Sequence, residues 1–321
     1  MAYSLRKIQL AIAALVMVST GYAHGSIATS GAGCDEGCGT DTCCSDSCCG
    51  TFFVGAEALY LRAYEGGLSN VCEGTEIVET EQNNKIVSRL HGKSHDPDFK
   101  WNLGFRLGAG YKFGDCNCGI GAYWTHFNSH NDGHDHDHRW KLDFDVIDLL
   151  YGCDYDLCNC FVLTPFAGLR YARIEQKLNT HFVSTVKGSD PDRITSTGHI
   201  KEDFWGIGPL FGLEGDWGMG CGFSLYGRVS LAFLYGNFHV RSHQNEVFHT
   251  GTNINHLRHN TDAYQAVVDT GFGVRWRTCV CDNPFTVQLG LEQHRYFNHN
   301  QFCGYGDLSL DGVSLAVGYE Y

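Results

Sequence analysis

LSLDGVSLAVGYEY, the segment from Leu308 to Tyr321, alternates apolar residues with small or polar ones. From Val313 onward every second residue is apolar or aromatic, and the residues between them are glycine, serine, alanine or glutamate. Successive side chains of a strand point to opposite faces, so the segment predicts a strand with one apolar wall. A soluble sandwich buries such a wall against a second sheet, whereas an outer-membrane barrel turns it toward lipid. This strand alone favours the sandwich.

A second segment favours the membrane. KWNLGFRLGAGYKF, from Lys100 to Phe113, has a longer alternation with Trp101 at one end and Tyr111 and Phe113 at the other. Soluble sheets seldom bury so long a strand with aromatic residues at both ends. A bilayer with aromatic belts at both interfaces requires that pattern.

The remaining chain repeats the pattern. About ten such segments are joined alternately by short turns and by mostly long polar connections, which predicts a transmembrane antiparallel β-barrel with short periplasmic turns and long external loops. Soluble up-and-down barrels share the alternation but are usually smaller. In WKLDFDVIDLLYG we expect Trp140, Leu142, Phe144 and Val146 to face outward, with a bulge near 147–150 where the phase changes.

Composition agrees with a single large all-β domain of 321 residues. Glycine is abundant (40 residues), proline is scarce (5), and aromatic residues make up 13%. The mean hydropathy of −0.22 does not exclude a membrane protein, because a barrel exposes only alternate residues to lipid.

The N-terminus resembles a secretory signal. Arg6 and Lys7 precede an apolar run from Ile8 to Val18, and small residues stand before a cleavage site after Ala23. We expect residues 1–23 to be a signal peptide, 24–51 a Cys-rich periplasmic tail and 52–321 the barrel. Cleavage changes the net charge from −13 to −15, because two basic and no acidic residues are lost, so nucleic acid is not an expected partner.

Sixteen cysteines in an exported chain imply disulfides. Seven fall at the predicted short turns, six in the tail and two at the opposite rim, while Cys153 lies one strand end away from the turns. The cross-link candidates are Cys34, Cys38, Cys43, Cys44, Cys48, Cys49, Cys116, Cys118, Cys158, Cys160, Cys221, Cys279, Cys281, Cys72 and Cys303.

The C-x-C pairs are poorly placed to bond internally, because residues i and i+2 of an extended chain lie about 6.5–7 Å apart. They are better placed to reach the tail, a neighbouring turn or another protein. Two hypotheses stand side by side: intramolecular staples, or a hub that links the barrel to other Cys-rich envelope proteins. Zinc in the tail is a third option, and Cys72 and Cys303 are candidates to pair with each other.

Histidines concentrate in the predicted external loops, which include a His-rich loop from Val240 to Asn260 and a polar loop near Lys187 to His199. In HNDGHDHDH, His134, His136 and His138 are weak candidates for Zn²⁺ or Cu²⁺, against the simpler interpretation of a solvated acidic loop. No catalytic constellation or phosphate loop stands out, so we expect no enzyme activity and no cofactor.

FWGIGPLFGLEGDW, FSLYGRVSLAFLYGNF and PFAGLRYARIEQKL resemble the major outer membrane protein-like porins of the Legionella and chlamydial type. The resemblance covers Phe52 to Tyr321. It implies a pore-forming outer-membrane barrel with a structural, disulfide-stiffened role in the envelope, and it carries over no catalytic residues.

We therefore expect a general porin in the bacterial outer membrane that passes small hydrophilic solutes. The alternative is a closed structural or adhesin barrel whose His-rich loops bind a partner or metal. Expected partners are outer-membrane lipid, solutes and Cys-rich envelope proteins, and the chain could form oligomers. The predicted pore-lining residues are Glu57, Lys100, Arg106, Asp143, Asp145, Arg170, Glu214, Arg228, Asp269, Arg275 and Glu292.

Overall fold

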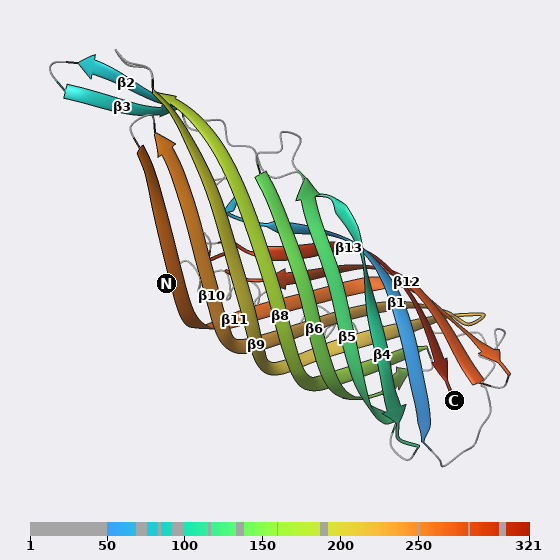
Figure 1. The fold of residues 1–321 in the computed structure, drawn as a ribbon. Helices are drawn as coiled ribbons and strands as arrows, with labels where there is room; N and C mark the ends of the chain where they lie inside the picture. The colour runs from blue at the N-terminus through green and yellow to red at the C-terminus, as the bar shows by residue number, and fades with distance from the viewer. Residues whose placement is uncertain are drawn as a thin grey trace, which may run out of the picture. The chain divides into compact units, whose positions relative to one another are not determined.

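The structure is a computed structural model that describes residues 50–68, 76–82, 85–91, 99–114, 117–132, 138–158, 160–186, 192–248, 251–281, 283–301 and 306–321. Its main feature is one antiparallel sheet that closes on itself (Figure 1). The strands around the barrel are β1 (Thr51–Glu65), β4 (Trp101–Lys112), β5 (Cys118–Asp132), β6 (His138–Cys153), β8 (Phe161–Val186), β9 (Asp192–Gly220), β10 (Phe223–Phe248), β11 (Gly251–Val280), β12 (Asn283–Tyr296) and β13 (Leu308–Glu320).

Closure comes from two long pairings. β1 pairs with β13 from Phe53↔Glu320 to Glu65↔Leu308, and β6 pairs with β8. β7 (Tyr155–Cys158) is a short strand that pairs with the start of β8. A closed antiparallel sheet leaves no unpaired edge, which is what strands in lipid require. The predicted all-β barrel of about ten strands is confirmed.

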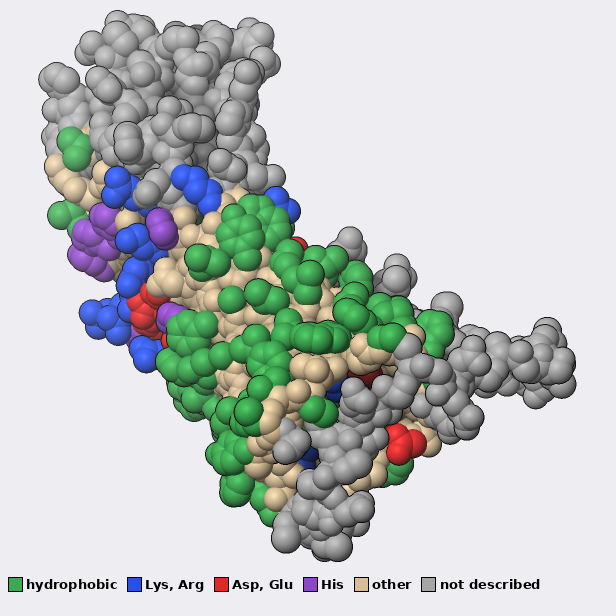
Figure 2. Space-filling view, turned by 90° about the vertical axis from the view of Figure 1, so that its right-hand side faces the viewer, with side chains coloured by type: hydrophobic (Ala, Val, Ile, Leu, Met, Phe, Trp, Pro, Cys, Tyr) green, Lys and Arg blue, Asp and Glu red, His purple; other side chains and the backbone are tan. Residues whose placement is uncertain are grey.

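The barrel wall carries an apolar band between two sets of aromatic residues. On β9, Trp217 and Trp205 are half-exposed at the two ends of the apolar band. Ile207, Phe211 and Leu213 lie exposed between them. Figure 2 shows such side chains covering much of one face. Because the phase of the alternation matches this band, lipid contact explains the exposure of so many large apolar side chains.

On the side away from the short turns, the strands continue past the aromatic residues that border the band. There the apolar side chains point into the barrel and the polar ones point outward. Trp140, Leu142, Phe144 and Val146 are buried inside the barrel. The prediction that these four face outward is wrong, and so is the predicted bulge, because β6 keeps an unbroken register with β5 and β8. Outside the bilayer the outer wall meets water, so the unchanged alternation turns its polar side outward.

Two predicted loops are also strands. The His-rich segment expected as a loop from Val240 to Asn260 belongs to β10 and β11, which pair as far as Phe248↔Gly251. β8 and β9 likewise pair as far as Val186↔Asp192. β2 (Glu76–Gln82) and β3 (Lys85–His91) form a separate hairpin within the polar stretch after β1. Among the described residues, no helix is long and apolar enough to cross a membrane.

Candidate functional site

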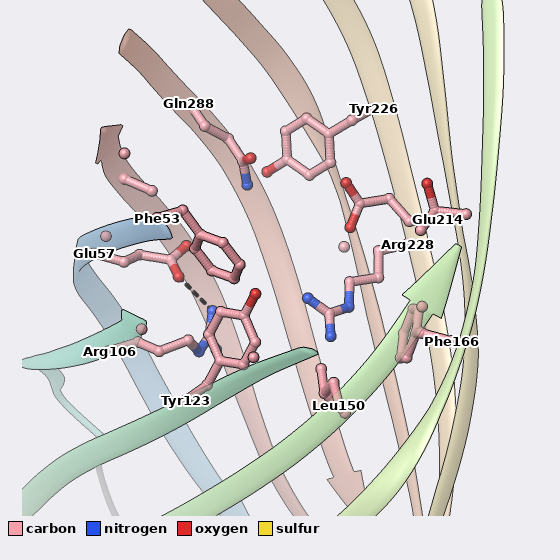
Figure 3. A pocket seen from close by; sticks show the side chains of 18 of the residues that line it. Phe53, Glu57, Arg106, Tyr123, Leu150, Phe166, Glu214, Tyr226, Arg228 and Gln288 are labelled. Atoms are coloured by element: carbon pink, nitrogen blue, oxygen red, sulfur yellow. Dashed lines mark hydrogen bonds and ion pairs between the residues drawn. The ribbon is translucent and has the colours of Figure 1, made fainter. Parts of the chain in front are cut away.

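The barrel encloses a cavity of about 800 Å³. Its lining runs from the short-turn rim, at Asn117, Asp154 and Glu320, to Phe144 and Tyr296 in the middle of the barrel. Figure 2 shows blue and red side chains set back in a recess near the lower end of the described part. In Figure 3 polar and aromatic side chains from several strands point into this space.

One network of charged side chains crosses the cavity. Arg106 on β4 contacts Glu57 on β1 at 2.5 Å and Glu292 on β12 at 3.0 Å, and its Nε donates to Thr125 at 3.0 Å. Figure 3 shows Arg106 and Glu57 reaching toward each other from adjacent strands. His294 Nε2 lies 3.3 Å from Glu292. A single arginine therefore holds two carboxylates that would otherwise face each other.

The network continues to the opposite wall. His294 Nδ1 lies 2.9 Å from Asp269, which contacts Arg170 at 2.7 Å. Arg170 also makes a bidentate pair with Asp148, with both contacts at 2.7 Å. Bidentate arginine–carboxylate pairs are strong and geometrically fixed, so they brace the barrel across its interior.

A second network lies nearer the rim. Arg275 contacts Glu214 at 2.6 Å and Asp216 at 2.5 Å, and Arg277 contacts Asp216 at 3.2 Å. Arg228 differs from these residues. Its guanidinium stacks on Phe166 at 4.5 Å from the ring centroid, with no carboxylate of the described residues within ion-pair distance.

Apolar side chains close the barrel on the outer side of the cavity. The largest fully buried ones come from several strands and form one continuous cluster. We call this cluster the plug; its members with exposed fractions below 2% include Leu59, Leu61, Phe127, Trp140, Leu142, Ile174, Leu178, Phe204, Leu210, Leu234 and Tyr296. Small barrels have interiors just wide enough for side chains to fill. Here the filling is a mainly apolar core.

Three ionisable groups are buried with the plug, outside the apolar band. Glu202 Oε1 and His299 Nε2 lie 3.8 Å apart, and both residues are fully buried. Burial raises the pKa of Glu202 to about 8 and lowers that of His299 to about 3. Burial, and then the nearby Glu202, raises the pKa of Glu65 well above its usual value. At neutral pH the Glu202–His299 contact therefore joins two uncharged groups.

This burial makes stability depend on pH. A carboxyl group whose folded pKa is raised contributes stability that is complete below about pH 4.5 and is lost as the pH rises through about 8. Glu202→Gln is expected to flatten the fall in unfolding free energy between about pH 5 and about pH 9. The measurement is urea unfolding across this range. Glu175→Gln is the control, because ion pairs lower the pKa of that group to about 2. An equal effect in both variants would contradict the claim that the raised pKa of Glu202 causes the fall in stability.

The structure places eight of the predicted pore-lining residues around the cavity: Glu57, Arg106, Arg170, Glu214, Arg228, Asp269, Arg275 and Glu292. Three others lie elsewhere. Lys100 is exposed just before β4, and Asp143 and Asp145 point outward from the extended part of β6, where they contact Asn128 and His126 of β5. The phase of β6 is the reverse of the predicted one, so the prediction for the two aspartates is wrong.

Sequence reasoning missed Asp148, Asp216 and His294, which complete the two networks. The signal was present for each of them. Asp216 and His294 share strand faces with the predicted Glu214 and Glu292. The correct phase of β6 would have placed Asp148 inside.

The cysteines of the short-turn rim are largely bonded. Cys118 at the start of β5 forms a disulfide with Cys153 at the end of β6. Cys160, Cys221 and Cys279 also belong to disulfides. Cys158 and Cys281 are free and exposed. The other candidates lie outside the described residues: Cys34, Cys38, Cys43, Cys44, Cys48, Cys49, Cys72, Cys116 and Cys303.

Loss of the Cys118–Cys153 bond has a predictable cost. The bond closes a loop with a sequence separation of 35, so Cys153→Ser is expected to lower the unfolding free energy by about 3–4 kcal/mol. Urea unfolding under oxidising conditions measures the change. Cys281→Ser removes a free thiol at the same rim and should leave stability unchanged. Equal losses in the two variants would show that the bond does not support the fold.

The metal hypothesis concerns three histidines. His134 and His136 lie outside the described residues, and His138 opens β6 with its side chain undescribed. Within the described part of the chain, no group of three or more His, Cys, Asp or Glu side chains is arranged to hold a metal ion.

A closed antiparallel barrel with an aromatic-bordered apolar band defines a transmembrane β-barrel protein. The chain belongs to the family of the Legionella pneumophila major outer membrane protein precursor, whose family model matches residues 47–319. The predicted family is confirmed, and the protein is located in the bacterial outer membrane. None of the curated proteins compared with the chain matches it significantly.

Several solved structures are similar to this chain. The outer membrane protease OmpT of Escherichia coli has 11% identity, a TM-score of 0.39, and coverage of 84% of this chain and 96% of its own. Ail of Yersinia pestis, solved with the heparin analogue sucrose octasulfate, has 12% identity, a TM-score of 0.26, and coverage of 85% and 99%. The Pseudomonas putida toluene transporter TodX has 8% identity, a TM-score of 0.32, and coverage of 86% and 90%. The fold assignment rests on the strand pairing of this chain.

Proposed function

We propose that this protein is a structural barrel of the outer membrane whose lumen is closed toward the cell exterior. The observation that carries the proposal is the plug. Its side chains come from opposite walls of the barrel: Leu59 of β1 and Phe204 of β9 are both essentially without solvent exposure. A hydrated ion would have to enter this mainly apolar core, at a large desolvation cost.

Disulfides give the structural role its second support. Signal-peptide removal after Ala23 would deliver the chain to an oxidising compartment, where rim disulfides form. Bonds such as Cys118–Cys153 then lock strand ends together. The exposed thiols of Cys158 and Cys281 are candidates to bond the Cys-rich tail or other Cys-rich envelope proteins. We propose no enzymatic activity, since most charged groups of the cavity, among them Arg106, Arg170 and Arg275 with their carboxylate partners, are engaged in ion pairs that brace the barrel.

One observation favours a second candidate, the general porin. The cavity is large, and it carries charges of both signs from the rim to the middle of the barrel. A rearrangement of the plug would join it to the exterior and create a charged path for small hydrophilic solutes. Opposed charges across such a path would make passage slow and weakly selective.

Liposome swelling distinguishes the two functions. Liposomes containing the refolded protein, transferred into isotonic arabinose, are expected to swell no faster than protein-free liposomes. Swelling at rates that fall with increasing sugar size would instead establish the porin. Folding is checked on the same sample by the heat-dependent shift in gel mobility.

A further inference from the structure

A row of cations runs across the outer wall of the barrel, on the part of the strands that continues past the apolar band on the side away from the short turns. Lys141 of β6 lies opposite Lys177 of β8, and Lys177 lies opposite Lys201 of β9. Lys201 lies opposite Arg241 of β10, which lies opposite Arg258 of β11. Five adjacent strands therefore place a Lys or Arg at the same level. We call these five residues the basic row.

This arrangement costs stability in the free protein. Like charges directly opposite each other on neighbouring strands are destabilising, and the basic row contains four such pairs in succession. General basicity does not explain it, because the chain has 23 Lys and Arg against 36 Asp and Glu. A bound polyanion would remove the repulsion.

Intramolecular acids neutralise only part of the row. Lys177 contacts Glu175 at 2.5 Å, and Lys201 contacts Glu175 at 3.1 Å and Asp203 at 3.3 Å. The other three cations are exposed, and no carboxylate among the described residues lies within ion-pair distance of Lys141, Arg241 or Arg258. Three positive charges therefore remain for an external partner.

The row also borders a groove. Lys177, Lys201, Arg241 and Arg258 line a surface hollow of about 350 Å³, together with the His199, His243 and His256 side chains of the next row outward. Figure 2 shows blue and purple side chains gathered beyond one end of the apolar band. The groove provides space for a phosphate group between several donors.

Height above the membrane identifies the partner. Lys201 lies four residues beyond Trp205, and Arg241 lies six residues beyond Tyr235. At ~3.3 Å per residue and a strand tilt of ~40°, the row lies roughly 10–15 Å beyond the aromatic residues that mark the headgroup level. That is the level of phosphorylated sugars on a glycolipid, above the phosphates of ordinary phospholipids.

We propose that the basic row binds the phosphate groups of a phosphorylated glycolipid in the outer leaflet. Lysine and arginine side chains have long stems that let the charged ends follow an irregular headgroup. Arg241 and Arg258 supply the planar donor pairs that match phosphate oxygens. The proposal depends on the outer-membrane location and is independent of whether the lumen conducts.

The test titrates the refolded full-length mature protein, in zwitterionic detergent, with rough-type lipopolysaccharide by thermophoresis. The triple variant Lys141→Gln, Arg241→Gln, Arg258→Gln is expected to bind about 100-fold more weakly, equivalent to about 3 kcal/mol at 1.4 kcal/mol per tenfold. The matched control Arg62→Gln, Lys100→Gln, Arg295→Gln removes the same charge elsewhere on the exterior and should bind like the wild type.

Two measurements need no variant. Lipopolysaccharide stripped of phosphate should bind the wild type as weakly as intact lipopolysaccharide binds the triple variant, and added salt should weaken intact binding. Equal binding of stripped and intact lipid, or of triple variant and wild type, would overturn the proposal. Binding of inorganic pyrophosphate or of a heparin fragment as tightly as the lipid would also overturn it, because the partner would then be a free phosphate or a sulfated glycan.

Discussion

Replacing Arg106 with alanine is expected to lower the unfolding free energy of the barrel by about 3–5 kcal/mol. Arg106 stands between Glu57 and Glu292 in the interior, and the side chains of both acids are about 10% exposed. Without the arginine, two poorly solvated carboxylates face each other with no cation between them. The loss is measured by urea unfolding of the refolded protein in detergent.

Arg228→Ala is the matched control, since it removes a second lumen arginine that stacks on Phe166 and has no carboxylate partner among the described residues. It should cost much less than Arg106→Ala. Combining Arg106→Met with Glu57→Gln and Glu292→Gln should recover most of the stability, because no buried charge is left alone. If the two alanine variants lose equal stability, the network does not brace the barrel.

Emptying the plug is expected to turn a silent barrel into a conducting one. Phe144 of β6 lies at the border of the cavity and the plug. Phe204 lies two strands further round on β9, and Ile174 of β8 lies between them in the strand register. Phe204 also packs against Phe238, with ring centroids 4.5 Å apart. Phe144→Ala with Phe204→Ala removes two rings from the closure and should produce discrete current steps in a planar bilayer.

The same change costs stability, at about 3–5 kcal/mol per buried phenylalanine, so folding is verified by gel mobility before recording. Phe211→Ala with Phe233→Ala is the control, because these two rings lie exposed on the lipid-facing wall. The control should stay silent. A folded but silent plug variant would mean that the closure does not depend on these rings.

Much of the barrel could be predicted from the sequence because lipid imposes a simple rule on every strand. In β9 and β10 every second residue around Trp205, Phe211, Leu225 and Phe233 is apolar, and this alternation alone indicates the outer wall, where the structure has the four side chains exposed. The aromatic residues at both strand ends distinguished lipid from a second sheet. Short turns and long connections then fixed the order of the strands.

The extension beyond the membrane could not be predicted by the same rule. There the apolar side of each strand turns inward, so Trp140 and Leu142 were assigned to lipid when they fill the plug. Alternation gives two faces but does not say which face meets water. The tertiary surroundings decide this, and they change along a single strand as it leaves the bilayer.

The candidate site was predicted in part for the same reason. Arg106 and Glu57 lie on adjacent strands, and the phase of β1 and β4 placed both inside. The ion pairs to Glu292 and Asp269 depend on closure of the barrel and on contacts across its interior, which strand periodicity does not encode. The basic row was hidden because its five members are far apart in sequence and meet only through strand register.

Single-channel recording from the wild-type protein without residues 1–23, in a planar bilayer, is the most direct test of the closed lumen. The refolded, heat-modifiable barrel should insert without discrete current steps, with and without reductant, because disulfides lie at the rim and the plug lies beyond the cavity. Ohmic steps from the wild type in the absence of any substitution would contradict the closed barrel and establish a porin.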